Sequence, residues 1–568
     1  MENSRIADIF DEIADLLDLK DANRFRIRSY RNAARTVREL SFQMEDIDSR
    51  DKDFDDIPNI GEKTAHKIRE ILETGTCRRL EDLKKQSPGN LTRLMDVPSL
   101  GPRKAMQIHK ELNVSSLEEL KQAAQDQRIR ELDGFGEKSE QKIITGINML
   151  GKTEGRILYN TASEYVGKLS GYLDTLETVS RYEPAGSFRR RKETVGDLDV
   201  LIRAQDREQA ARDILEYSDI REVISRGDER LSVRLDSGLQ VDFRFFESGH
   251  FGAALLYFTG SKEHNIEIRK LVREQEWKLN EYGLFNEDSL LAGKTEKAVY
   301  QRLGMDWIPP ELRENRGEVE AALNSGLPAL IKEHDLTGDL HAHSDRTDGK
   351  ATVREMAEAA RERGYEYLAI TDHSQRVTVA NGLNDEDMKK HADTIRRIDE
   401  EFDDLRLLAG VEVDILKNGG LDLKEKTLEN LDWVVASVHS YFEQDEKKMT
   451  ERIIRAVKSG VVHCLGHPCG RMIGKRDPIR FDTDAVFGSC AEHGVFLEIN
   501  SHPDRMDLPD YLGKSAQDAG CSFVITTDAH SRENLDLIRL GVYTARRGWI
   551  ERENVLNTVS AETLKKKI

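Results

Sequence analysis

Two aspartates, Asp197 and Asp199, stand two residues apart in the segment GSFRRRKETVGDLDVLI, residues 186–202. The apolar run around and after them is typical of a strand, and side chains two apart on a strand point to the same face. Neighbouring carboxylates repel each other unless a cation lies between them. A hard cation such as Mg²⁺ suits these oxygen ligands. The pair therefore predicts a metal site on a strand.

A phosphate-binding turn is expected about ten residues before this pair. Gly186 and Ser187 would offer free backbone N–H groups and a hydroxyl, which can hold a phosphate. The arginines that follow add positive charge. Together the turn and the aspartates predict a site for a polyphosphate and its Mg²⁺. The alternative is a charged edge strand beside a solvated turn, which Asp-x-Asp alone would favour.

A third carboxylate comes from a predicted hairpin, LSVRLDSGLQVDFRFF, residues 231–246, with its turn at Ser237-Gly238. Asp242 lies inside the second strand, between Val241 and Phe243. A charged side chain is costly there unless it is paired or binds metal. Two aspartates on one strand and one on its neighbour predict a two-metal site. Such sites stabilise both the attacking and the leaving oxygen of an in-line displacement.

The segments LLYFTGSKEHNIEIRKL, 255–271, and LNEYGLF, 279–285, add specificity. With them the chain resembles the family X DNA polymerases, the DNA polymerase beta group. The resemblance implies that Asp197, Asp199 and Asp242 bind two Mg²⁺ or Mn²⁺ ions, and that Asp242 accepts the proton of the primer 3′-OH. It also implies that dNTPs and gapped or primer-template DNA are the substrates.

The same resemblance assigns a nucleotide pocket. Tyr257 and Phe258 would pack the sugar and discourage a ribose 2′-OH, whereas Arg269 would contact the template strand. Core aromatics and a helix-face charge are the alternatives for these three residues taken singly. The full set implied to bind nucleotide is Gly186, Ser187, Arg190, Tyr257, Phe258, Gly260 and Asn265.

Three segments near the N-terminus share a pattern of an apolar residue, a tight turn with glycine and a basic helix: IPNIGEKTAHKIREIL (57–72), VPSLGPRKAMQIHKEL (97–112) and LDGFGEKSEQKIITGI (132–147). Such a helix N-terminus can hold a DNA phosphate without reading sequence. The segments resemble helix-hairpin-helix motifs, which implies DNA contacts at Gly61, Lys63, Gly101 and Gly136. Asn59 and Ser99 stand where the family prefers glycine. Because Ser tolerates a positive φ less than Asn does, the second motif is the weakest. Ordinary helix caps are the alternative.

In the polymerase beta group, a lysine on the first of these helices forms a Schiff base with abasic sugars. The resemblance places Lys67 at that position. A nucleophilic lysine needs a lowered pKa, which Lys63 and Arg26 could supply by their charge. A solvated helix lysine is the alternative. The hypothesis is a deoxyribose-phosphate lyase activity.

The last third of the chain is rich in histidine, with 11 of the 15 at or after residue 334. Seven β-branched runs recur there, separated by helical patterns such as residues 351–364, and nearly every run ends in a His, Asp or Glu. This alternation predicts a parallel α/β barrel, whose active site lies at the carboxyl ends of its strands. The runs are 337–344, 367–374, 407–415, 433–440, 461–468, 495–502 and 523–531.

This set of ligand-type residues resembles the PHP (polymerase and histidinol phosphatase) family. The resemblance implies up to three Mn²⁺, Zn²⁺ or Fe²⁺ ions, which would lower the pKa of bound water for phosphoester hydrolysis. Asp348 stands where many members have His, which would shift preference toward harder ions such as Mn²⁺. The implied ligands are His341, His343, Asp348, His373, Glu412, His439, His467, Asp528 and His530.

Other polar residues of this region receive lesser roles. Glu498, Asn500 and His502 are expected around the ligands or at the substrate, and Asp372 is expected to orient a ligand. His391, His463 and His493 are expected to be structural. Cys464 and Cys469 flank His467 but lack a second Cys/His pair, so they too are expected to be structural.

Composition indicates a multidomain protein of 568 residues with a formal net charge of −19. That charge argues mildly against a nucleic-acid partner, but basic clusters at 25–38, 101–110 and 188–192 provide local patches. Five cysteines indicate a reducing cytoplasm, and no apolar run approaches the roughly 20 residues of a membrane span. A monomer is expected.

The predicted fold class is multidomain, with a helical helix-hairpin-helix region, an α+β nucleotidyltransferase palm and thumb, and a C-terminal distorted (β/α)7 PHP barrel. The predicted domains are a lyase-like helical domain 1–85, helix-hairpin-helix fingers 86–150, a palm 151–247, a thumb 248–312, a linker 313–334 and the PHP domain 335–568.

The sequence therefore predicts a DNA polymerase that fills short gaps in repair, joined to a metal-dependent 3′-5′ exonuclease or 3′-end-processing phosphoesterase that could also act at abasic sites. One alternative is a nucleotidyltransferase acting on RNA or a small molecule, which shares Gly-Ser and Asp-x-Asp. Another is a DNA-end scaffold with vestigial sites. The YFTGS segment and the complete ligand sets count against these alternatives.

Overall fold

The structure is a computed structural model that describes residues 3–20, 22–38, 44, 54, 57, 60–85, 94, 97, 100–153 and 155–568. Contacts divide the chain into two compact units. The first comprises Met1–Glu154 with Gly474–Arg476, and the second comprises Gly155–Ile473 with Asp477–Ile568. No helix in the described ranges is both long and apolar enough to cross a membrane.

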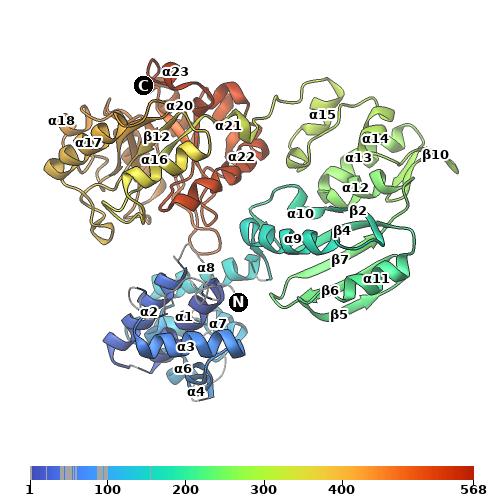
Figure 1. Ribbon diagram of the computed structural model, residues 1–568, viewed down its shortest axis with the longest axis horizontal. Coiled ribbons are helices and arrows are strands. Elements are labelled where there is room, and N and C mark those ends of the chain that lie inside the picture. Colours follow the sequence, from blue (N-terminus) through green and yellow to red (C-terminus); the bar gives the residue numbers. More distant parts are fainter. Residues whose placement is uncertain are drawn as a thin grey trace. The chain divides into compact units, whose positions relative to one another are not determined.

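The first unit is built from helices in its described part (Figure 1). Apolar residues at helical spacing on α1, such as Ile6, Phe10, Ile13 and Leu17, are buried in one core with Ala33 of α2. The helices are α1 (Asn3–Leu19), α2 (Arg24–Arg38), α3 (Glu62–Thr74), α4 (Arg78–Lys85), α6 (Pro102–Leu112), α7 (Leu117–Gln125), the 3-10 helix η3 (Ile129–Glu131) and α8 (Glu137–Thr153).

The second unit begins with a five-stranded sheet of order β2-β4-β7-β6-β5. Strands β4 and β7 run parallel, and Asp199 is the register partner of Asp242. The predicted hairpin is confirmed as antiparallel β6 and β7. The elements are β1 (Ile157–Leu158), α9 (Tyr159–Leu173), β2 (Val179–Pro184), α10 (Gly186–Arg189), β3 (Thr194–Val195), β4 (Asp197–Ala204), α11 (Arg207–Leu215), β5 (Ile220–Arg226), β6 (Arg230–Leu235) and β7 (Gln240–Phe245).

A second group of helices follows, with a three-stranded antiparallel sheet of order β10-β9-β8. The stretch from 308 to 331 is well packed, since Arg313 and Glu318 are fully buried. The elements are α12 (Phe251–Thr259), α13 (Lys262–Glu274), β8 (Lys278–Asn280), β9 (Gly283–Asn286), β10 (Ser289–Ala292), α14 (Glu296–Arg302), η4 (Pro310–Leu312), α15 (Glu318–Leu323) and η5 (Glu333–Asp335).

The C-terminal part is a seven-stranded parallel sheet whose strands follow chain order, β11 to β17. A parallel bridge between Ala342 and Ala529 joins its two ends, so the sheet is a nearly closed barrel. All seven predicted strands are confirmed. They are β11 (Gly338–Ala342), β12 (Tyr367–Ile370), β13 (Arg406–Asp414), β14 (Trp433–Ser437), β15 (Cys464–Leu465), β16 (Phe496–Asn500) and β17 (Phe523–Thr526).

Helices cover the outside of this barrel, as the yellow to red part of Figure 1 shows. The predicted helix within 351–364 is confirmed as α16, where Thr352 and Glu355 form a capping box. The helices are α16 (Val353–Glu362), η6 (Thr378–Ala380), α17 (Asp385–Asp399), α18 (Glu425–Leu428), α19 (Glu446–Val457), α20 (Thr483–His493), α21 (Asp510–Asp518), η7 (Arg532–Leu537), α22 (Ile538–Arg547), η8 (Arg552–Asn554), η9 (Leu556–Thr558) and α23 (Ala561–Leu564).

Candidate active sites

Three aspartates share one face of the five-stranded sheet. Asp197 and Asp199 alternate with buried Leu198 and Val200 on β4, while Asp242 lies on the adjacent parallel strand. Asp197 is exposed, Asp199 is partly buried, and Asp242 is only 4% exposed. The backbone thus brings the predicted carboxylates together from two segments more than forty residues apart.

Two arginines from the hairpin pair with these carboxylates. Arg244 Nε donates to Asp199 Oδ1 at 3.2 Å, and Arg230 Nη2 donates to Asp242 Oδ2 at 2.9 Å. Burial raises the pKa of Asp199 in spite of Arg244. Burial also acts to raise the pKa of Asp242, but hydrogen bonds from Ser232 and Arg230 outweigh it and the pKa is lowered. A divalent cation bound here would compete with these guanidinium groups.

The Gly186-Ser187 segment is a short helix, α10, rather than the predicted turn. Gly186 has a φ of 59°, and a Cβ built on it would lie 3.1 Å from Asp199 Oδ2. Glycine therefore serves both the left-handed backbone and the close approach to the carboxylate. The segment still lies directly beside the aspartates.

A cavity of about 730 Å³ opens next to this helix; we call it the basic pocket. Eight arginine and lysine side chains line it, against four carboxylates, so its lining carries an excess of positive charge. This charge and size suit a nucleoside triphosphate. The predicted residues that line it are Gly186, Ser187, Arg190, Asp197, Asp199, Tyr257, Phe258, Gly260, Asn265 and Arg269, whereas Asp242 lies outside the lining.

The aromatic wall of the basic pocket is held by local contacts. Asn265 Nδ2 donates to the carbonyl oxygen of Tyr257 at 2.7 Å, and Tyr257 meets Phe258 edge to face. The guanidinium of Arg244 lies 4.2 Å from the Phe258 ring centroid. These contacts fix the wall, which lies beside the sheet carboxylates.

Several residues that line the basic pocket were not predicted from the sequence. Lys262 and Arg316 line it, and so do Asp510, Tyr511 and Arg547 of the barrel. No local motif marks the barrel residues, because they reach the pocket only through the packing of the barrel against the sheet.

The nine predicted barrel ligands converge at the carboxyl ends of the strands. Glu412 is central, with His373 Nδ1 at 2.8 Å, His467 Nε2 at 2.9 Å and His439 Nε2 at 3.2 Å from its carboxylate. His343 Nε2 lies 3.1 Å from Asp528 Oδ1. We call the nine residues the histidine cluster.

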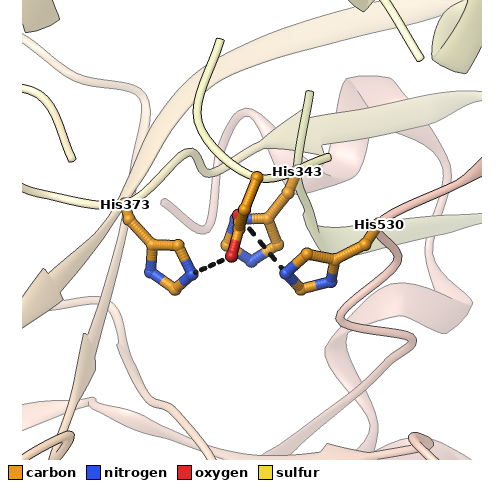
Figure 2. A group of neighbouring side chains, drawn as sticks. His343, His373 and His530 are labelled. Atoms are coloured by element: carbon orange, nitrogen blue, oxygen red, sulfur yellow. Dashed lines mark ion pairs between the residues drawn. The ribbon is translucent and has the colours of Figure 1, made fainter. Parts of the chain in front are cut away.

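One side of the cluster is shown in Figure 2, where His343, His373 and His530 point toward one another. The carboxylate between them belongs to Asp348, which lies 3.4 Å from both His373 Nε2 and His530 Nε2. His343 and His530 stack with ring centroids 4.2 Å apart.

The donor set fits divalent ions. The described chain contains three groups of three or four His, Asp or Glu residues in which the ligand atoms lie within 4.8 Å of one another. All three groups belong to the barrel. Buried nitrogens such as His341 Nε2, His343 Nδ1 and His467 Nδ1 have no hydrogen-bond partner there. His467 and Asp528 also have positive φ, a strained backbone often found at functional sites.

Burial and close contacts shift the pKa values of the cluster residues in both directions. Burial, with the neighbouring His530 and His373, lowers the pKa of His343 to about 4. Burial opposes ionisation of Glu412 and Asp528, yet the surrounding imidazoles hold the pKa of each carboxyl well below its usual range. Although burial opposes it, the neighbouring carboxylates raise the pKa of His373 to about 10 and that of His439 to about 9, so protonated imidazoles and a divalent cation would compete for the same carboxylates.

Residues around the cluster largely meet expectation in their contacts. Glu498 Oε1 lies 2.5 Å from His341 Nδ1, and its other oxygen accepts from the backbone N–H of His467. Asn500 Nδ2 donates to Asp528 Oδ2 at 3.1 Å. The sequence missed Arg505, whose Nε lies 3.7 Å from Asp528 Oδ2.

Asp372 contacts no predicted ligand by a hydrogen bond among the described residues. It accepts from Ser344 Oγ at 2.6 Å and from Thr347, and His391 Nε2 lies 2.7 Å away. It therefore holds the loop after His343 rather than a ligand side chain. His502 Nδ1 accepts from the backbone N–H of Asp504 at 3.3 Å.

The residues expected to be structural make structural contacts. His391 hydrogen-bonds Asp372, His463 stacks on Trp433, and His493 Nδ1 lies 2.9 Å from a backbone carbonyl. The five cysteines are free and buried.

The N-terminal motifs place glycines before three helices. Gly61 and Gly101 are the N-cap residues of α3 and α6, and the carbonyl of Gly136 accepts the first hydrogen bonds of α8. A Cβ on any of the three would meet nothing within 4 Å, so each surface is open. Lys63 lies in the first turn of α3. Asn59 and Ser99 lie outside the described residues.

Lys67 is half-buried on α3, and its Nζ donates to the carbonyl of Lys63 at 2.6 Å. Burial lowers its pKa, with the charges of Arg79 and Arg26 acting in the same direction. The predicted effect of Arg26 is present, whereas Lys63 is not among the main causes.

Family models match four parts of the chain. Residues 1–77 match a helix-hairpin-helix domain, 91–148 a SAM-like helix-hairpin-helix tandem, 254–314 the DNA polymerase beta thumb, and 339–502 the PHP domain. These matches agree with the order of helices, sheet and barrel.

The curated relatives include one that matches nearly the whole chain and others that match two fifths of it or less. The DNA polymerase/3′-5′ exonuclease PolX of Bacillus subtilis is 37% identical over 564 residues, 99% of this chain and 98% of the relative. A probable phosphatase of Thermoanaerobacter sp. is 29% identical over 234 residues, 39% of this chain and 91% of the relative. A probable phosphatase of Acetivibrio thermocellus is 33% identical over 168 residues, 29% of this chain and 65% of the relative.

Proposed function

This chain belongs to the PolX family of DNA polymerase/3′-5′ exonucleases, in which a family X polymerase precedes a PHP domain, and we propose that it fills short gaps during DNA repair and trims 3′ ends at a second, separate site. It is a DNA-directed DNA polymerase with a 3′-5′ exonuclease domain. The observation that supports the two-site proposal is the presence of two distinct ligand sets, one beside the basic pocket and one inside the barrel.

For polymerisation, we propose that the basic pocket holds a dNTP. Ser187, Arg190 and the backbone of α10 would bind the triphosphate, and Tyr257 and Phe258 would pack the sugar. Asn265 would meet the base and Arg269 the template strand. The primer 3′-oxygen would attack the α-phosphate and form a new P–O bond, while the bond from the α-phosphorus to the bridging oxygen breaks and pyrophosphate leaves. Asp242 would accept the 3′-OH proton.

Asp197, Asp199 and Asp242 would hold two Mg²⁺ or Mn²⁺ ions, and the nine residues of the histidine cluster up to three Mn²⁺, Zn²⁺ or Fe²⁺ ions. When bound, such ions neutralise developing charge on phosphate oxygens and lower the pKa of water. Glu498 would orient His341, and Asn500 would orient Asp528.

The N-terminal unit would hold DNA by its phosphates. Gly61, Lys63, Gly101 and Gly136 stand at open helix N-termini, which favour anions without reading sequence. We propose the domain limits 1–85, 86–150, 151–247, 248–312, 313–334 and 335–568; the division of contacts near Gly155 supports the boundary between 86–150 and 151–247.

A primer assay tests the two-site proposal. The substrate is a 5′-labelled primer beside a one-nucleotide gap, with dNTPs and Mg²⁺ or Mn²⁺. Wild type should lengthen the primer with dNTPs and shorten it without them. Asp242→Asn should lose only lengthening and Asp528→Asn only shortening. The exposed aspartates Asp236 and Asp518 supply matched Asn controls. Primers that only shorten under every condition would contradict the polymerase proposal.

Lyase activity is a second candidate, favoured by the half-buried Lys67 with its lowered pKa. A Schiff base would form between Nζ and the C1′ aldehyde of an abasic sugar, with loss of water. Borohydride should then trap wild type on 5′-deoxyribose-phosphate DNA. Trapping should disappear in Lys67→Ala and persist in Lys121→Ala, an exposed lysine on α7. Equal trapping in both variants would exclude Lys67.

A further inference from the structure

The loop from 186 to 194, which includes α10, is held by the barrel as well as by its own sheet. Arg547 Nη1, at the end of α22, donates to the carbonyl of Arg190 at 2.6 Å. Arg471 Nη2 donates to Glu193 at 2.7 Å, and the Arg191 guanidinium lies 4.4 Å from the Tyr543 ring centroid. A segment assigned to triphosphate binding therefore takes its position from residues more than 270 positions away in the chain.

A single carboxylate links Arg547 to the side chain of Arg190. Glu314 Oε1 accepts from Arg190 Nε at 2.9 Å and from Arg547 Nη1 at 3.1 Å. Arg547 Nη2 also donates to Asp510 at 2.6 Å. The Arg547 side chain is 3% exposed, and those of Arg190 and Glu314 are each 12% exposed, so the group is largely shielded from water.

Charge sharing at Glu314 has a direct consequence for nucleotide binding. Arg190 can attract a triphosphate only to the extent that Glu314 does not neutralise its charge. Arg547 gives Glu314 a further cation beside Arg190 and the more distant Lys192, at 3.9 Å, and so weakens its hold on Arg190 in a site where ionic interactions are strong. Without Arg547, Glu314 would pair with Arg190 more fully, and the loop would lose the hydrogen bond at the Arg190 carbonyl.

We propose that Arg547 of the barrel is a positioning residue for nucleotide binding in the polymerase site, because it orients the Arg190 backbone and shares Glu314. This inference rests on the proposed polymerase site. It makes the barrel a structural part of that site, in addition to its own exonuclease centre.

The neighbouring residue provides a matched control. Arg546 lies on the same helix, donates to Glu311 at 2.8 Å and to the carbonyl of Ile331 at 2.9 Å, and so makes contacts of the same kind away from the loop. Steady-state gap filling should be measured for wild type, Arg547→Met and Arg546→Met. We expect the KM for dNTP to rise about tenfold in Arg547→Met, with kcat changed less, and to stay within about twofold in Arg546→Met.

A double variant separates charge sharing from general support of the fold. In Arg547→Met/Glu314→Gln, Arg190 no longer has its competing carboxylate, so the KM should fall back toward the wild-type value. Exonuclease activity should be unchanged in every variant. Equal KM values for Arg547→Met and Arg546→Met would overturn the inference, and no recovery in the double variant would overturn its claim that Arg547 acts by sharing Glu314.

Two further outcomes remain distinguishable. If Arg547→Met does not fold, Glu314→Gln alone carries the test, since it should lower the KM for dNTP below that of wild type, and an unchanged or higher KM would overturn the inference. If wild type itself fails to fill the gap, the proposed function is wrong, and the inference about Arg547 is overturned with it because it rests on that function.

Discussion

The two ligand sets of this chain differ in their burial and in the partners of their charged groups. The sheet aspartates lie beside an open basic pocket and pair with Arg230 and Arg244. The barrel ligands are mostly buried, and several of their imidazole nitrogens lack a hydrogen-bond partner in the described residues. We infer that the sheet takes up ions together with a phosphate substrate, whereas the barrel retains its ions as part of the fold.

The largest expected effect comes from the centre of the barrel cluster. Glu412→Gln should lower exonuclease activity by about a thousandfold or more, because one uncharged amide replaces a carboxylate that three imidazoles approach. Gap filling should persist. Primer shortening and bound metal measured by mass spectrometry check this, with exposed Glu425→Gln as the control. Unchanged shortening would contradict the proposed role of Glu412.

A buried carboxylate also supports the polymerase side. Glu296 accepts hydrogen bonds from Arg189 at 2.7 and 2.8 Å and from the fully buried Arg313 at 2.6 Å. Glu296→Gln should lower the free energy of unfolding by about 3 kcal/mol, since it leaves buried guanidinium groups unpaired. Urea unfolding measures the loss, and a change below about 0.5 kcal/mol would contradict it.

The free energy of unfolding that Glu296→Gln loses should depend on pH. The two arginines outweigh burial and hold the pKa of Glu296 well below its usual range. The stabilisation is therefore complete above the unfolded pKa of about 4.3 and is lost as the pH falls toward the lower folded value. The difference between wild type and Glu296→Gln should be constant at neutral pH and should narrow in acid. A difference in the free energy of unfolding that stays constant down to acid pH would show that the lowered pKa of Glu296 does not contribute to stability.

Metal removal should affect the two sites differently. After prolonged treatment with a chelator, excess Mg²⁺ should restore gap filling at once. Primer shortening should stay about tenfold lower until Mn²⁺ or Zn²⁺ is added, because a site rich in imidazole ligands binds these ions more tightly than Mg²⁺. Immediate recovery of both activities in Mg²⁺ would remove the distinction between the two sites.

A smaller effect is expected at Arg244, which competes with a cation for Asp199. Arg244→Met should lower the Mg²⁺ concentration for half-maximal gap filling by about threefold, the effect of one partly exposed ion pair. A Mg²⁺ titration measures this. Arg234→Met, which removes a pair with exposed Glu222, should leave the midpoint unchanged. An equal shift in both variants would point to overall charge instead.

Local patterns in the sequence predicted much of this structure. The alternation around Asp197 and Asp199 predicted β4, and the apolar runs that end in His, Asp or Glu predicted seven barrel strands, because strand periodicity and strand-end polarity are local properties. The short helix at Gly186 was predicted as a turn, since four residues carry too little periodicity to distinguish the two.

Long-range packing set the limits of prediction. Nothing near Met506, Tyr511 or Arg547 indicates that they line a pocket with Asp197, because their placement depends on how the barrel meets the sheet. Asp372 was expected beside a ligand, but its carboxylate is used by the loop after His343. Such choices depend on which partner is nearest in space, which spacing along the chain does not determine.

The ten residues from His502 to Tyr511 include side chains that lie at the histidine cluster and side chains that line the basic pocket. Arg505 lies 3.7 Å from Asp528 of the histidine cluster, and Met506 and Tyr511 line the basic pocket. Substitutions in this short stretch would therefore be pleiotropic. A genetic screen that scores only synthesis, or only degradation, would assign a variant here to one defect when the molecule has two, so alleles in this stretch need both assays before they are classified.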